Sequence, residues 1–131
     1  MMMGDGCGMT GHSMQRHRQA MMGGLPSTYR GLRNPYPADA RVLSSGKDLY
    51  QANCVACHGE RGLGDGPAAA ALSPRPANLR WFLRMRMASD GYLMWTISEG
   101  GAAFGSAMPA FKDSLSEEAR WRIIRYLRSL D

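Results

Sequence analysis

Apolar and polar positions follow a helical period in the second half of the chain. The clearest case is the C-terminal segment, where Ser116 precedes two acidic residues and apolar side chains then recur every three or four positions. We expect Ser116 to cap a helix that reaches about Leu130 and carries basic residues toward its end. No segment alternates between apolar and polar residues as a half-buried strand does, so the pattern predicts an all-α fold.

Three further helical segments are predicted upstream, over residues 44–53, 67–72 and 89–99. We expect Ser44 or Ser45 to cap the first of these helices, and Ser89 or Asp90 to begin the third. The second helix is short and starts at Pro67. Glycine pairs and prolines separate the segments, and residues 102–113 are predicted to be a loop.

The first 38 residues have a different composition. Residues 1–24 contain seven of the 11 methionines and six glycines but no Leu, Ile, Val or aromatic residue, which is too little apolar surface to offset the entropy of ordering. Residues 25–38 are rich in proline and are expected to form an extended linker. The predicted organisation is therefore a flexible Met- and Gly-rich tail over 1–24, a linker over 25–38 and one compact domain over 39–131.

Length and charge exclude some classes of protein. A chain of 131 residues is one domain in size, and none of its apolar runs is long enough to span a membrane. The net charge is +5, but the arginines are scattered along the chain rather than clustered with aromatic residues. We therefore expect neither a nucleic-acid partner nor a transmembrane segment.

The chemistry is indicated by the run Cys54-Val55-Ala56-Cys57-His58, a C-x-x-C-H motif. Two thiols at this spacing can add to the two vinyl groups of one haem, and the adjacent imidazole of His58 then lies under the iron as an axial ligand. The motif predicts one covalently attached haem c. The alternatives are a zinc half-site and a redox dithiol, but the first needs a second ligand pair and the second an alternation of strands and helices.

A second axial ligand is expected from a methionine, because no histidine follows His58. Met108 lies in an irregular loop beside Pro109, where a thioether can point inward, and is the preferred ligand. Met87 is the second choice, whereas Met94 lies in an apolar helical pattern and is expected in the core.

From about Ala40 to Leu130 the chain resembles a class I mono-haem c-type cytochrome. The resemblance rests on Gly46 and Tyr50, then on CVACHG and GLGDGPAAAALSPRPANL, and finally on the EGG loop that leads to MPAF and the terminal helix with Trp121 and Tyr126. It implies an all-α fold in which the first and last helices cross around the haem, with Gly46 permitting their close approach and Tyr50 packing with Tyr126.

The resemblance also implies that a proline carbonyl orients His58 through its other ring nitrogen. Pro74 and Pro76 both compete for that role, and Pro76 is preferred. We further expect Arg75 and Arg80 to pair with haem propionates. Other expected haem neighbours are apolar or donate hydrogen bonds, namely Leu72, Leu79, Trp81, Tyr92, Phe104 and Phe111.

The function implied is one-electron transfer between redox protein partners, without enzymatic activity of its own. A haem enzyme such as a peroxidase, or a gas or redox sensor, would need an open iron position, which a bound Met108 denies. Haem attachment at such a motif normally follows export, so the resemblance implies a bacterial periplasm and a leader already removed. The domain could also be the haem subunit of a larger respiratory or oxidoreductase complex in a membrane.

The tail carries a separate hypothesis. Thioether and thiolate groups favour Cu(I), so the soft donors near the N-terminus form a candidate copper site. Its proposed ligands are Cys7, Met9, His12 and Met14. The alternative is a tail whose methionines bind no metal.

Overall fold

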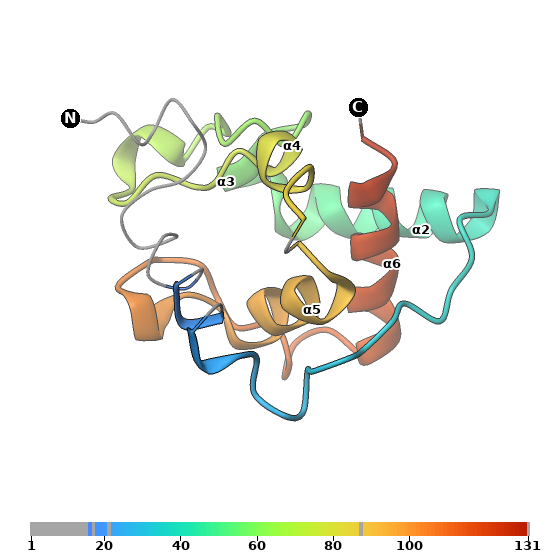
Figure 1. Ribbon diagram of the computed structural model, residues 1–131. Coiled ribbons are helices and arrows are strands. Elements are labelled where there is room, and N and C mark those ends of the chain that lie inside the picture. The colour runs from blue at the N-terminus through green and yellow to red at the C-terminus, as the bar shows by residue number, and fades with distance from the viewer. Residues whose placement is uncertain (1–15, 17, 21, 87, 131) are drawn as a thin grey trace.

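A computed structural model describes residue 16 and residues 18–20, 22–86 and 88–130. Within these residues there are helices and no strand, which confirms the all-α prediction (Figure 1). The elements in chain order are α2 (Ala40–Asn53), α3 (Val55–His58), the 3-10 turn η2 (Ala69–Ala71), α4 (Leu79–Phe82), α5 (Asp90–Glu99), the 3-10 turn η3 (Ala102–Phe104) and α6 (Glu117–Arg128).

Side-chain caps determine where the longer helices begin. Ser89 accepts a hydrogen bond from the Tyr92 N–H at the start of α5. Ser116 accepts one from the Ala119 N–H at the start of α6, and both caps were predicted. The predicted start of the first helix at Ser44 or Ser45 was wrong. The Asp39 carboxylate accepts from the Val42 N–H and begins α2 at Ala40, so the two serines lie inside the helix.

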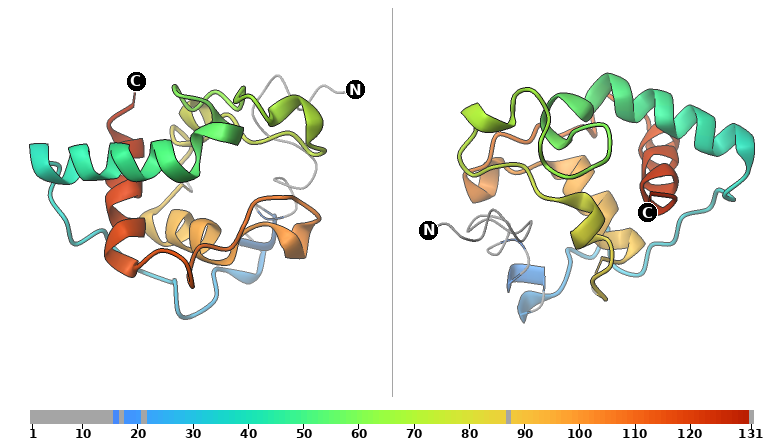
Figure 2. Two further views of the ribbon diagram at one scale, coloured as in Figure 1. Left: turned by 180° about the vertical axis from the view of Figure 1, so that it is seen from behind. Right: turned by 90° about the horizontal axis from the view of Figure 1, so that it is seen from above.

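Helices α2 and α6 cross steeply, as Figure 1 and the left view of Figure 2 show. Gly46 lies at the crossing, where a Cβ atom would be 2.9 Å from the Tyr126 Cβ and would overlap the Arg122 carbonyl oxygen. The rings of Tyr50 and Tyr126 pack beside it with centroids 5.6 Å apart. The close approach and the tyrosine pair expected from the resemblance are thus both present.

The proline-rich segment 25–38 packs against the helical domain and runs along α5 and α6 before it reaches α2 (Figure 1). Tyr29 is only 9% exposed, and its hydroxyl donates to the Glu99 carboxylate at 2.5 Å. The Asn34 side chain donates to the Trp121 carbonyl at 2.9 Å, and its backbone N–H donates to Asp90 at 2.8 Å. This segment, expected as a linker, therefore contributes to the core.

Across the described ranges, no helix combines the length and the apolar character needed to cross a bilayer.

Replacing Gly46 by alanine is predicted to destabilise the fold. The added methyl group would meet the backbone of α6 rather than a flexible side chain, and such overpacking costs about 1–3 kcal/mol. The free energy of unfolding, measured with urea and circular dichroism, should fall accordingly. Ser44→Ala on the exposed face of the same helix is the matched control and should change it little. Equal stability of the two variants would contradict the close contact.

Asp90 is predicted to stabilise the fold more at neutral than at acid pH. Desolvation opposes its ionisation, but hydrogen bonds from Arg128 and the Asn34 N–H outweigh that effect and lower its pKa. A carboxyl with a lowered pKa stabilises the folded state above its unfolded pKa of about 3.9, and this contribution is lost as the pH falls through the folded value. Asp90→Asn should cost about 1 kcal/mol near pH 7, and less near pH 3. A pH-independent difference would contradict this assignment.

Candidate functional site

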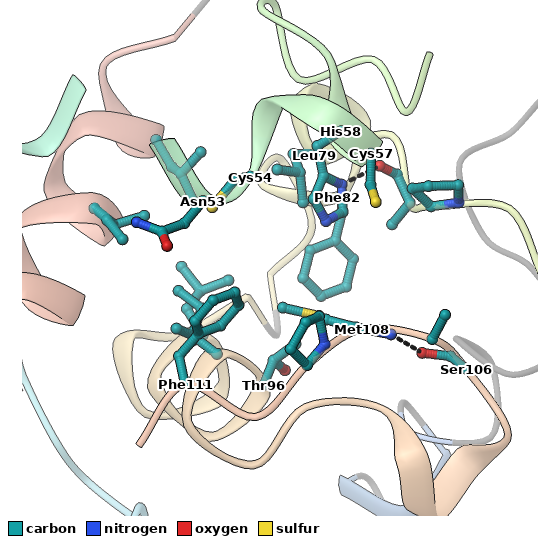
Figure 3. Close-up of a pocket in the computed structure, with 18 of the residues that line it drawn as sticks. Asn53, Cys54, Cys57, His58, Leu79, Phe82, Thr96, Ser106, Met108 and Phe111 are labelled. Carbon is teal, nitrogen blue, oxygen red and sulfur yellow. Dashed lines mark hydrogen bonds between the residues drawn. The ribbon is translucent and has the colours of Figure 1, made fainter. Parts of the chain in front are cut away.

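A mostly apolar cavity lies between two walls of the domain (Figure 3). The end of α2, α3 and the loop over residues 72–79 form one wall. Helix α5 and the loop over residues 106–111 form the other, and α6 closes one side. The apolar lining consists mainly of Leu72, Leu79, Phe82, Leu93, Ile97, Phe111, Ile123 and Leu127.

The single turn of α3 presents the C-x-x-C-H motif to this cavity. The N–H groups of Cys57 and His58 both donate to the Cys54 carbonyl, at 3.2 and 2.9 Å, so the three side chains follow one helical turn. All three line the cavity, and the two cysteines are free thiols rather than a disulfide. Burial, with a smaller contribution from Cys57, raises the pKa of Cys54 to about 12, so its thiol is protonated.

The glycine-rich loop after the motif wraps around α3, and its N–H groups donate hydrogen bonds to carbonyl groups of α3. The Gly64 N–H donates to the His58 carbonyl at 2.9 Å, and the Gly66 N–H donates to the Cys57 carbonyl at 3.0 Å. A Cβ atom on Gly66 would overlap the Val55 carbonyl oxygen, so only glycine allows this approach. The GLGDG sequence therefore fixes the turn that carries the motif.

The imidazole of His58 is held by a backbone carbonyl. Its Nδ1 lies 3.1 Å from the Ala77 carbonyl oxygen, which can only accept, so Nδ1 carries the proton and Nε2 stays free as a ligand. The expectation that Pro76 supplies this carbonyl was wrong by one residue, because the Pro76 carbonyl faces Gly64 instead. Burial lowers the pKa of His58, the hydrogen bond to Ala77 partly opposes this, and the charge of Arg16 adds a smaller lowering.

Met108 approaches the cavity from the wall opposite His58, with its thioether sulfur directed inward (Figure 3). Its N–H donates to the Ser106 hydroxyl at 3.2 Å, and its carbonyl accepts from the Gly101 N–H at 3.0 Å. A Cβ atom on Gly100 would lie 2.7 Å from the same carbonyl oxygen. The EGG sequence and the Met108 loop are therefore packed together.

The other expected site residues divide into two groups. Arg75, Pro76, Leu72, Leu79, Tyr92 and Phe111 line the cavity, whereas Arg80, Trp81 and Phe104 do not. Since α4 is a helical turn, its residues Leu79 and Phe82 face inward while Arg80 and Trp81 point away, and Trp81 is 40% exposed. This turn was not predicted, so the inward and outward positions could not be distinguished.

Several predicted ligands lie outside the described residues. These are the second-choice iron ligand Met87 and the four copper ligands Cys7, Met9, His12 and Met14. In the part of the chain that is described, no three His, Cys, Asp or Glu side chains cluster as a metal site.

Arg16 is a cavity residue that the sequence analysis missed. Its guanidinium lies 5.2 Å from the centroid of the Phe104 ring and donates to the Gly100 carbonyl at 3.1 Å. The segment around it has no apolar period, so the pattern of the chain carried no signal for this contact.

Crossing terminal helices, an apolar cavity and a C-x-x-C-H turn together define a c-type cytochrome domain. The model of the family described as cytochrome C oxidase, cbb3-type, subunit III matches residues 41–127, and the chain belongs to this family. No curated protein matches the chain.

A solved structure, a reducing HAO-like protein complex from Kuenenia stuttgartiensis, is also similar. The identity is 28% and the TM-score 0.62, over 76% of this chain and 47% of that one. The present chain therefore spans about half the length of this neighbour.

Family membership implies a covalently bound haem c and haem-based electron transfer. The residues of the cavity fit such a group. Cys54 and Cys57 offer two unpaired thiols, His58 offers a free Nε2, and the remaining lining is largely apolar.

Removal of both motif cysteines is predicted to abolish covalent haem. The double variant Cys54→Ala, Cys57→Ala should lose haem staining on a denaturing gel and give no haem c pyridine haemochrome, because no thioether bond can form. The control is Cys7→Ala, which removes the third cysteine of the chain and should keep full staining. Covalent haem in the double variant would contradict the assignment.

Proposed function

We propose that this protein is a periplasmic one-electron carrier whose haem c is attached to Cys54 and Cys57 and ligated by His58 and Met108. The observation that carries the proposal is the placement of a free imidazole nitrogen and a thioether on opposite walls of one cavity (Figure 3). When bound, haem iron supplies a reversible one-electron change between the ferrous and ferric states.

The protein's own residues keep this site rigid and dry. The Ala77 carbonyl holds the ring of His58, and the hydrogen bonds of the Met108 loop hold the opposite ligand. Apolar residues such as Leu93 and Ile97 exclude water from the space between them. Rigid ligands and the absence of water limit the rearrangement that accompanies electron transfer, and His/Met ligation favours the ferrous state.

Two other functions, a peroxidase and a gas sensor, both require that an outside molecule reach the iron. The inward orientation of Met108 argues against both, because its thioether occupies the wall from which such a molecule would bind. The Met108 loop is tied to Gly101 and Ser106, which disfavours its displacement.

A second candidate function is that of a haem subunit in a larger redox complex. The family is described as a subunit of an oxidase, and the solved neighbour belongs to a complex and is about twice as long as the matched region. Haem staining of a native gel of the source cells distinguishes the two. A free carrier gives a haem-stained band separate from the large complexes, whereas a subunit migrates with its complex.

Met108→Leu is predicted to remove the sixth ligand while preserving side-chain volume. The ferric wild-type protein should show the weak far-red absorption band of methionine–iron ligation, and the variant should lose it. Met85→Leu removes a thioether that packs against the core but does not line the cavity, and this control should keep the band.

Each outcome separates the hypotheses. A high-spin ferric spectrum in the wild-type protein would overturn the electron-carrier proposal. A band that survives in Met108→Leu would show that another residue ligates the iron. A band lost equally in both variants would show that the effect is not specific to Met108.

A further inference from the structure

Arg16 places a charged side chain at the wall of a mostly apolar cavity. It lines the cavity, stacks over Phe104 and donates one hydrogen bond to the Gly100 carbonyl. Its Nε is buried and has no hydrogen-bond partner among the residues that the structure describes. Burial lowers the pKa of Arg16, which means that the protein environment disfavours its charge. A buried cation with an unused donor is costly unless an anion accompanies it.

The described part of the cavity wall offers no such anion. Its titratable side chains are Arg16, Tyr50, Cys54, Cys57, His58, Arg75 and Tyr92, with no carboxylate among them. Desolvation raises the pKa of Tyr50 well above its usual value and that of Tyr92 to about 12, so both stay neutral. The cavity therefore presents two arginines to whatever fills it.

The two arginines differ in their access to water. Arg75 is exposed, so solvent and salt screen its charge. Arg16 is partly buried against Phe104, where screening is weaker and a charge interacts more strongly. A carboxylate inside the cavity would gain more from Arg16, and would also use its free Nε–H.

We propose that Arg16 binds a carboxylate of the haem c group and keeps that carboxylate ionised at neutral pH. This inference rests on the proposed haem site. It makes Arg16 a positioning residue that lies outside the family match over residues 41–127 and within the segment of unusual composition. Since a guanidinium can offer two parallel donors to a carboxylate, arginine suits this role.

The expected consequence is a reduction potential that depends little on pH. With Arg16 present, the carboxylate stays ionised through the neutral range and its charge does not change. Without Arg16 the pKa of the carboxylate rises, so the group takes up a proton as the pH falls. Because a negative charge near the iron favours the ferric state, this protonation raises the potential at lower pH.

The experiment is a redox titration of the haem-loaded proteins between about pH 5 and pH 9, a range that brackets a carboxylate with a raised pKa. Arg16→Gln should lower the ferrous-to-ferric ratio at a fixed ambient potential by roughly tenfold at the alkaline end, and by less at the acid end. Arg16→Lys retains the charge and should restore most of the wild-type behaviour. Arg18→Gln removes an exposed arginine two residues away and should follow the wild-type curve.

The outcomes are distinct. A curve for Arg16→Gln that matches Arg18→Gln, or that is displaced equally at every pH, would overturn the proposal. The far-red band of the ferric protein is recorded for each variant. Its absence from the wild-type protein would count against the proposed His/Met ligation, whereas its presence with no special effect of Arg16→Gln would count against Arg16 alone.

Discussion

The backbone of α6 lies against Gly46 so closely that no side chain fits between them, and the haem site depends on this contact. The contact fixes the crossing of α2 and α6, and the end of α2 leads directly into the turn that carries Cys54 and His58. The same crossing brings Ile123 and Leu127 of α6 to the cavity. One glycine therefore sets the position of the motif relative to the apolar surface that it faces.

Polar contacts between residues that do not line the cavity hold the opposite wall. Helix α5 is joined to the segment 25–38 through Tyr29 and Glu99, and to α6 through Asp90 and Arg128. Neither Asp90 nor Glu99 lines the cavity, and the Met108 loop lies against the C-terminal end of the helix. The proline-rich segment thus supports the wall from which Met108 projects, although none of its residues lines the cavity.

The sequence predicted the structure correctly where a local feature, such as a capping residue or a helical period, determined it. The caps of α5 and α6 and the helical period of α6 each predicted an observed feature. The carbonyl group that accepts from His58 was predicted one residue too early, at Pro76 instead of Ala77. The two neighbouring carbonyls differ only in direction, and this direction depends on how the loop packs against Gly64. Arg80 and Trp81 were assigned to the cavity because the turn α4 has no periodicity long enough to detect.

By composition Arg16 belongs to the segment 1–24, yet its side chain contacts the domain at Phe104 and Gly100. Composition alone therefore does not show which residues of this segment pack against the domain. A segment as poor in apolar residues as 1–24 is not expected to form a core of its own. A single arginine needs no core, because one ring and one carbonyl on an existing domain are enough to position it. Arg16 lines the cavity while its guanidinium lies over the Phe104 ring. A residue of this kind leaves no periodic pattern, so its role can be recognised only once the cavity that receives it is known.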